Sequence, residues 1–77
     1  MDKTIQTELE KMLVQAKAQI IANELTIEAL NELSVPGAMA TQVVNQQTSL
    51  KASNDLTRIY ITKMEKYLKD TVVEEVK

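Results

Sequence analysis

The chain lacks the residue types on which the commonest metal, disulfide and haem sites depend, because its 77 residues include no Cys and no His. Without Cys there is no disulfide framework and no thiol nucleophile, and without either residue there is no Cys/His zinc site and no haem ligation. The absence of His also removes the usual acid–base group near neutral pH. No nucleophile, base and oxyanion site come together elsewhere, so we predict that the protein is not an enzyme and uses no metal or cofactor.

Large aromatic side chains are nearly absent too, since the chain has 2 Tyr and neither Trp nor Phe. Its apolar residues are Leu, Ile, Val, Met and Ala, which pack well but individually bury less surface than an aromatic ring. Domains below roughly 70–80 residues rarely gain more than about 3–5 kcal/mol from a single core. We therefore expect the fold to be completed by oligomerisation or by a partner chain.

Glycine and proline occur once each, and both lie in the segment Ser34-Val35-Pro36-Gly37. A single Gly excludes a Gly-rich phosphate loop. Pro disfavours helical geometry at the preceding residue, and Gly permits the chain to reverse. We predict one helical domain over residues 1–77, with a helix over about 4–33, a turn at 34–37, a second helix over about 38–70 and a frayed, β-branched tail at 71–77.

Positive and negative charges nearly balance, because the formal net charge is only −2. A balance so close to zero disfavours non-specific nucleic-acid binding, which needs a strongly basic surface. The N-terminus has no basic segment followed by an apolar run, so we expect no signal peptide. The apolar runs are too short for a membrane span. We expect a cytoplasmic protein that does not bind membranes.

Apolar residues recur at alternating spacings of three and four along both predicted helices, which is the pattern of a heptad seam. In the first segment the seam consists of Leu9, Leu13, Ala16, Ile20, Asn23, Ile27 and Leu30. In the second it consists of Ala40, Val43, Gln47, Leu50, Asn54, Thr57, Ile61, Met64 and Leu68. Two helices of similar length joined by a short turn form an antiparallel hairpin. We therefore predict an all-α fold of two long helices.

Two features of this hairpin depend on more than the heptad pattern. The second helix could break near Ser53, which could cap a third helix, but the seam passes through Asn54 without a change of phase and favours an unbroken helix. A turn centred near Val35 and Pro36 would place Asn23 at the level of Gln47. These two side chains could then form a buried polar layer that fixes the alignment, or they could be solvated at the edge of the hairpin.

Each helix carries a second apolar stripe that a single hairpin does not need, and a partner must cover it. We predict that this stripe binds the partner, with Tyr60 and Tyr67 as aromatic anchors seven residues apart. The predicted partner-binding residues are Val14, Ile21, Leu25, Leu56, Ile59, Tyr60 and Tyr67.

Three polar patterns have a functional interpretation beside a structural one. Glu24, Glu28 and Glu32 share a helix face and could bind a hard cation with help from a partner, or form a solvated acidic face. Lys63 and Lys66 are expected to return beside Glu8 and Glu10 at the open end. The uncharged residues around 42–49, together with the Lys and Arg residues of the second helix, could line a pocket for a small anionic ligand between subunits, although no motif supports it.

The hairpin pattern resembles the small helical co-chaperones of type III secretion needle subunits. The residues that carry the resemblance are 9–17 (LEKMLVQAK) in the first helix and 45–52 (NQQTSLKA) with 59–61 (IYI) in the second. The resemblance covers most of the chain as a pattern, without a signature motif. It implies a helical hairpin that holds an aggregation-prone helical partner, which would be a subunit of a secretion apparatus.

The sequence leaves three hypotheses about function. The first is a non-enzymatic adaptor or co-chaperone whose helical hairpin binds an amphipathic helix of a partner. The second is a self-assembling structural or scaffold protein, such as a four-helix dimer or a higher oligomer. The third is a small oligomeric inhibitor that sequesters a nucleotide-like ligand between its subunits.

Overall fold

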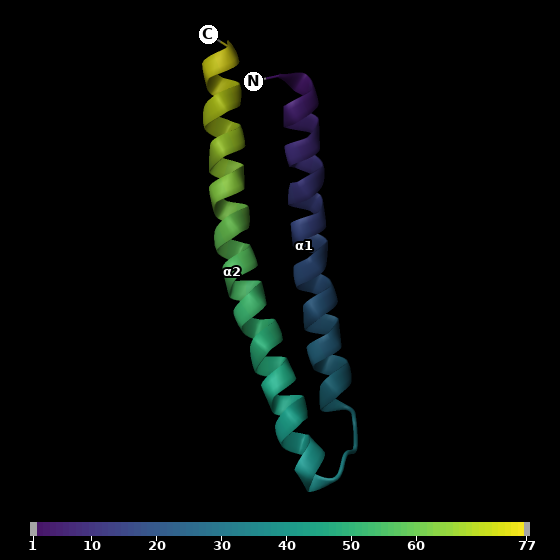
Figure 1. The fold of residues 1–77 in the computed structure, drawn as a ribbon. Coiled ribbons are helices and arrows are strands. Elements are labelled where there is room, and N and C mark those ends of the chain that lie inside the picture. Colours follow the sequence, from purple (N-terminus) through teal and green to yellow (C-terminus); the bar gives the residue numbers. More distant parts are fainter. Residues whose placement is uncertain (1, 77) are drawn as a thin grey trace.

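The protein is an antiparallel hairpin of two long α-helices (Figure 1). The computed structural model describes the backbone of residues 2–76 and the side chains of residues 2–71. Helix α1 spans Lys3–Asn31 and helix α2 spans Gly37–Val76. The molecule measures 61 × 16 × 13 Å along its principal axes. The predicted all-α hairpin is confirmed, and α2 runs through Ser53 without a break, so there is no third helix within the described residues.

Helix α1 begins with a side-chain cap. The carboxylate of Asp2 accepts a hydrogen bond from the backbone N–H of Thr4 at 2.6 Å, and the Asp2 carbonyl accepts one from Gln6 N–H at 2.9 Å. An N-cap of this kind satisfies backbone donors that have no partner inside the helix. At the other end, the N–H groups of Glu32 and Leu33 donate to the carbonyls of Ala29 and Leu30, which closes the last turn tightly.

The chain reverses in residues 32–36, and Gly37 does not take part in the way the sequence suggested. Gly37 is the first residue of α2, and its φ is not positive. The carbonyl of Pro36 accepts hydrogen bonds from Met39 N–H at 2.8 Å and Ala40 N–H at 3.2 Å. Pro36 thus precedes α2 and supplies its first carbonyl acceptor, while the reversal needs no left-handed residue.

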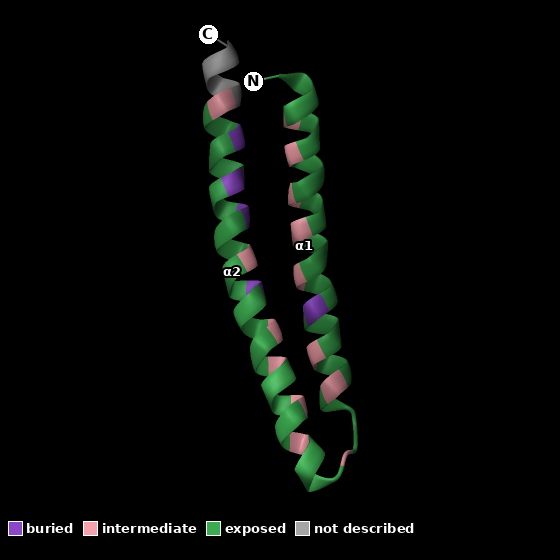
Figure 2. Cartoon of the chain, in the orientation of Figure 1, coloured by how far each residue is buried: buried purple, intermediate pink, exposed green. Residues whose placement is uncertain are grey.

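The heptad seams predicted from the sequence form the interface between the helices. Every predicted seam residue is buried or half-buried, and Gln6 and Thr71 extend the two seams at the open end. Figure 2 shows the less exposed residues as one stripe along the facing sides of both helices. The buried apolar residues, Ile61, Met64 and Leu68, lie toward the open end, whereas the most buried residue, Asn54, lies near the middle.

The alignment of the two helices differs by about one heptad from the alignment predicted. Asn23 lies opposite Asn54 and not opposite Gln47, whose amide instead contacts α1 near Asn31. The five residues between the helices run on past the end of α1, so that α2 begins beyond it (Figure 1). The first nine residues of α2, about 14 Å of helix, therefore extend past Asn31. The turn was predicted as a tight reversal, and this extended connection explains the error.

Helix α2 also extends beyond its predicted end. The sequence predicted a frayed tail from residue 71, whereas the helix continues to Val76. Thr71 is half-buried and lies in phase with the seam. Adding residues to an existing helix needs no new nucleation, and the lower helix propensity of β-branched residues costs only a few tenths of a kcal/mol each. Lys77, the last residue of the predicted tail, lies outside the described residues.

Candidate protein-binding site

A layer of amide side chains crosses the seam near the middle of the hairpin. Asn23 and Asn54 are 7% and 2% exposed, and the Asn23 amide donates to the Asn54 side-chain oxygen at 2.8 Å. Gln19 donates to the Asn23 oxygen at 2.9 Å, and the Asn54 amide donates to the Ile20 carbonyl at 3.3 Å. Both buried asparagines are therefore hydrogen-bonded, as buried polar groups must be to avoid a large desolvation cost.

Gln47 forms a second polar contact between the helices, nearer the connection. Its amide donates to the Ile27 carbonyl at 3.0 Å and to the Asn31 side-chain oxygen at 2.7 Å. The two seam polar positions recognised in the sequence, Asn23 and Gln47, thus each form cross-helix hydrogen bonds, but with different partners. The buried polar layer exists, and its second member is Asn54.

One flank of the hairpin carries ion pairs between the helices. Lys17 pairs with Glu65 at 3.2 Å, and Arg58 pairs with Glu24 at 2.9 Å. Each of these residues directly follows a seam residue, so all four lie on the same side of the interface. We call this side the charged flank. The predicted cross-helix pairs of Lys63 and Lys66 with Glu8 and Glu10 are not among the ion pairs of the described residues, because α2 is displaced along α1.

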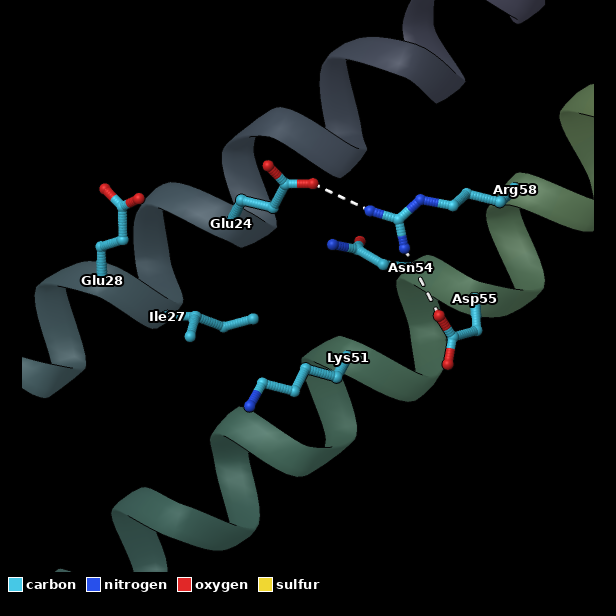
Figure 3. A pocket seen from close by; sticks show the side chains of 7 residues that line it. All are labelled: Glu24, Ile27, Glu28, Lys51, Asn54, Asp55 and Arg58. Carbon is cyan, nitrogen blue, oxygen red and sulfur yellow. Dashed lines mark hydrogen bonds and ion pairs between the residues drawn. The ribbon is translucent and has the colours of Figure 1, made fainter.

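A shallow surface hollow lies on the charged flank (Figure 3). Arg58 points to Glu24 and to Asp55, which lies 3.4 Å away. Glu28 and Lys51 complete its charged lining. Three carboxylates thus surround two cations, one of them already paired twice, and this balance does not suit an anionic ligand. Of the predicted cation-binding glutamates, Glu24 is held by Arg58, and the described residues contain no group of three potential metal ligands.

The opposite flank carries no charge over the length of the described side chains. It consists of the residues that directly precede every second seam residue (the g positions of the heptad), so they lie on the other side of the interface from the ion pairs. The charged residues Glu8, Lys63 and Asp70 precede other seam residues and lie further from the seam. The nine positions are Ile5, Met12, Gln19, Thr26, Met39, Gln46, Ser53, Tyr60 and Tyr67. We call this side the uncharged flank.

Four of the five apolar members of the uncharged flank lie toward the open end of the hairpin, and Met39 lies at the connected end. The alignment set by Asn23 and Asn54 places Met12 close to the level of Tyr67, with Ile5 further toward the open end, and places Tyr60 close to the level of Gln19. All four side chains are exposed, from 43% for Tyr60 to 56% for Tyr67. They lie beside the part of the seam where the buried apolar residues Ile61, Met64 and Leu68 pack. The result is a shallow apolar surface built from both helices.

The predicted partner-binding residues are all exposed, but the structure does not bring them onto one face. Val14, Ile21 and Leu25 lie on the side of α1 that faces away from α2, where they are 67%, 58% and 59% exposed. Leu56 and Ile59 lie on the corresponding outer side of α2 and are also exposed. Tyr60 and Tyr67 alone lie on a flank shared by both helices. The predicted set thus divides into two outer faces and one flank.

Ile5 and Met12 lie on the same flank as Tyr60 and Tyr67, but they were not predicted from the sequence as binding residues. The signal was present, because these residues are seven apart, as are Tyr60 and Tyr67. Both pairs directly precede seam positions. In an antiparallel pair of helices, the residues that precede these seam positions lie on the same flank of the interface, whichever helix carries them. Sorting the residues beside each seam by charge would have separated the two flanks.

Comparison with protein-family models, curated proteins and solved structures finds no match to this chain. The resemblance to needle-subunit co-chaperones therefore stays a prediction. Within the part of the chain that the structure describes, neither helix has an apolar stretch long enough to cross a membrane.

Proposed function

We propose that the protein is a protein-binding module that holds an amphipathic helix of a partner against its uncharged flank. The single observation that carries the proposal is the separation of charge between the flanks. One flank forms ion pairs between the helices, whereas nine positions on the other carry no charge. The cores of protein interfaces are depleted in charge and enriched in Tyr and Met, which fits this flank.

The apolar end of the flank supplies the anchors for such a helix. Tyr60 and Tyr67 are two turns apart on α2, with Met12 near the level of Tyr67 on α1 and Ile5 two turns further toward the open end. A helix laid between these rows would insert apolar residues at i, i+3 or i+4 and i+7, which is the usual pattern of helix-in-groove recognition. Gln19, Thr26, Gln46 and Ser53 continue the flank with side chains that can donate and accept hydrogen bonds.

A different protein suits this flank better than a second copy of the hairpin. If two copies packed flank to flank and antiparallel along their whole length, Tyr60 of one would lie near Ser53 and Thr26 of the other. The apolar end would then face polar side chains and bury little apolar surface. A partner helix with its own spacing of apolar residues has no such restriction. If the co-chaperone resemblance holds, this partner is an aggregation-prone helical subunit of a secretion apparatus.

Site-specific photo-cross-linking in cells tests the proposal. A benzophenone amino acid replaces Tyr60 or Tyr67 in the full chain, and the cross-linked products are identified by mass spectrometry. We expect both positions to cross-link to the same protein, through one segment whose apolar residues recur with helical spacing. Thr62 is the matched control, because it is exposed on the other side of the same helix.

Purified components then test the surface directly. The variant Tyr60→Glu should weaken binding of the identified segment by about thirtyfold or more, as expected for an aromatic interface anchor. The variant Lys69→Glu, on another face of α2, should leave it unchanged. Cross-linking from Thr62 equal to that from Tyr60, or products formed only between copies of this chain, would contradict the proposal.

A further inference from the structure

The outer face of α1 is an unusual surface for a helix that only one neighbour covers. The side of a hairpin helix that faces away from its partner is normally rich in charged residues. Here Val14, Ala18, Ile21 and Leu25 form an exposed apolar row, with Ala22 beside it. We define these four row residues as the outer face of α1. Since the seam lies on the other side of the helix, the middle of α1 is apolar on two sides, which is typical of a helix packed between two neighbours.

We infer that the outer face of α1 binds the same face of a second copy of this chain, in antiparallel orientation, to form a two-fold symmetric dimer. The row is self-complementary. When two copies run antiparallel about an axis between residues 19 and 20, Val14 lies opposite Leu25 of the other copy, and Ala18 lies opposite Ile21. A symmetric interface requires each residue to meet its counterpart in this way. The small Ala18 faces the larger Ile21, so the helices can approach closely.

The charges at the ends of the row match the same arrangement. Lys11 and Glu28 are the next residues of the row beyond Val14 and Leu25. In the antiparallel dimer, Lys11 of one copy lies opposite Glu28 of the other, and symmetry repeats this pair at the other end. Lys11 makes only an exposed contact of 3.4 Å with Glu8, and Glu28 has no ion pair among the described residues. In a parallel arrangement, like charges would face each other.

The symmetry axis also falls close to the middle of the hairpin. Asn23 lies opposite Asn54, so residues 19 and 20 of α1 lie level with residues 57 and 58 of α2. The midpoint of α2 lies between residues 56 and 57. Two copies packed through α1 would therefore overlap along nearly their full length, without long unpaired ends.

The outer side of α2 does not show the same self-complementarity. Around Leu56 and Ile59 an antiparallel copy would place Lys63 opposite Ala52 and Lys66 opposite Ser49, with no opposite charge to meet either cation. Contact between the outer side of α1 and the outer side of α2 in another copy would leave both remaining faces free. Such a contact repeats from copy to copy and generates rings or open filaments instead of two-fold dimers.

Analytical ultracentrifugation of the full chain over a dilution series tests the inference. We expect a monomer–dimer equilibrium. The variant Ile21→Glu should raise the dimer dissociation constant by at least about a hundredfold, because two symmetry-related charges would be buried in the interface. Leu56→Glu is the matched control, since Leu56 is an exposed apolar residue on α2, and the dissociation constant should not change. Circular dichroism should show that both variants remain helical.

A charge exchange tests the orientation of the two copies. Lys11→Glu and Glu28→Lys should each weaken the dimer by about five- to tenfold, because each places two pairs of like charges in contact. The double variant Lys11→Glu/Glu28→Lys should recover most of the affinity. Mixed copies carrying Val14→Cys and Leu25→Cys should form the mixed disulfide faster than either disulfide between identical copies.

Three outcomes would overturn the inference. They are a wild-type monomer up to millimolar concentration, a dimer that Ile21→Glu leaves intact, and open-ended filaments. None of them bears on the partner helix at the uncharged flank, which lies on another side of α1 and is tested by cross-linking from Tyr60 and Tyr67. Conversely, if the dimer forms but Tyr60 and Tyr67 cross-link to no partner protein, the dimer is supported and the proposed function is contradicted.

Discussion

Asn23 and Asn54 lie in the middle of a seam that is otherwise largely apolar, and their hydrogen bond depends on one alignment of the helices. If α2 slid by one heptad, Asn23 would lie opposite Gln47, and Asn54 would lie opposite Ala16. The same pattern of apolar residues would still be buried, since the pattern repeats every seven residues. The buried amide of Asn54 would have no side-chain amide opposite it. We therefore regard the asparagine pair as the feature that selects the observed alignment.

Replacing one asparagine should cost more stability than replacing both. In Asn54→Leu, Asn23 is left buried without its partner, and we expect the free energy of unfolding to fall by about 1–3 kcal/mol. In the double variant Asn23→Leu/Asn54→Leu, an apolar layer replaces the polar one, and stability should return to the wild-type value or exceed it. Urea unfolding followed by circular dichroism, at one protein concentration, measures both. Two single-variant losses that simply add in the double variant would argue against this role.

In the same double variant, the two helices should adopt more than one alignment. Spin labels at Gln15→Cys and Thr62→Cys lie level in the observed alignment, and the chain has no other Cys. A slide of one heptad displaces them by about 10 Å along the axis. Pulsed electron paramagnetic resonance should show one distance for the labelled wild-type background and a second, longer distance in the double asparagine variant. A single distance in both would mean that other contacts, such as those of Gln47, fix the alignment.

Arg58 shows how little exposed ion pairs contribute by comparison. It pairs with Glu24 and with Asp55, and all three side chains are at least half exposed. Pairs of this kind contribute about 0–1 kcal/mol and are screened by salt. Arg58→Ala should therefore lower the free energy of unfolding by less than about 1 kcal/mol, and the difference should shrink further in 0.5 M salt, a condition under which the Debye length is only about 4 Å. Lys69→Ala serves as the control. A larger loss that persists in high salt would show that the aliphatic part of Arg58 contributes through packing.

At the scale of the helices, the start of α2 offers a test of how the reversal is made. Gly37 is helical without a positive φ, and a Cβ at this position would meet no atom within 4 Å. Gly37→Ala should therefore raise the free energy of unfolding by about 0.4–1 kcal/mol, because it reduces the freedom of the unfolded chain. Ala38→Gly, at the next position, should lower it by a similar amount. If Gly37→Ala is destabilising instead, the connection requires a conformation that only Gly can adopt.

The helices also show which parts of the fold a sequence can predict. Seam residues such as Leu13, Ile20 and Ile61 were identified correctly, because burial in a two-helix interface follows the local heptad period. The heptad period does not determine how the two helices are aligned, because alignments that differ by one heptad bury the same pattern of residues. The path of residues 32–36 and the Asn23–Asn54 contact decide it, and both depend on three-dimensional geometry. Of the exposed apolar residues at the open end of the uncharged flank, only Tyr60 and Tyr67 were predicted to bind a partner. These two were recognised as aromatic residues, whereas Ile5 and Met12 were not singled out.

At the scale of the whole molecule, exposed apolar surface is distributed over three sides. The uncharged flank, the outer face of α1 and the outer side of α2 each carry apolar residues, while the seam alone provides a thin core. No described side chain is less than 2% exposed. A chain of this size gains little from such a core. Association is therefore expected to contribute much of the stability, and the melting temperature should rise with protein concentration.

The overall shape gives a final prediction that does not depend on any single contact. The radius of gyration of the Cα atoms is 17.6 Å, whereas a compact domain of 77 residues would have about 11–12 Å. Small-angle X-ray scattering of the Ile21→Glu variant, which should be monomeric, is expected to give a value close to that of the long hairpin. A value near that of a compact domain would mean that α2 folds back near Ser53 into a three-helix bundle. For the wild-type dimer the cross-section should increase while the longest dimension stays near 61 Å, because the copies overlap along their length. A dimer of about twice that length would instead place the contact at the ends of the hairpin, away from the outer face of α1.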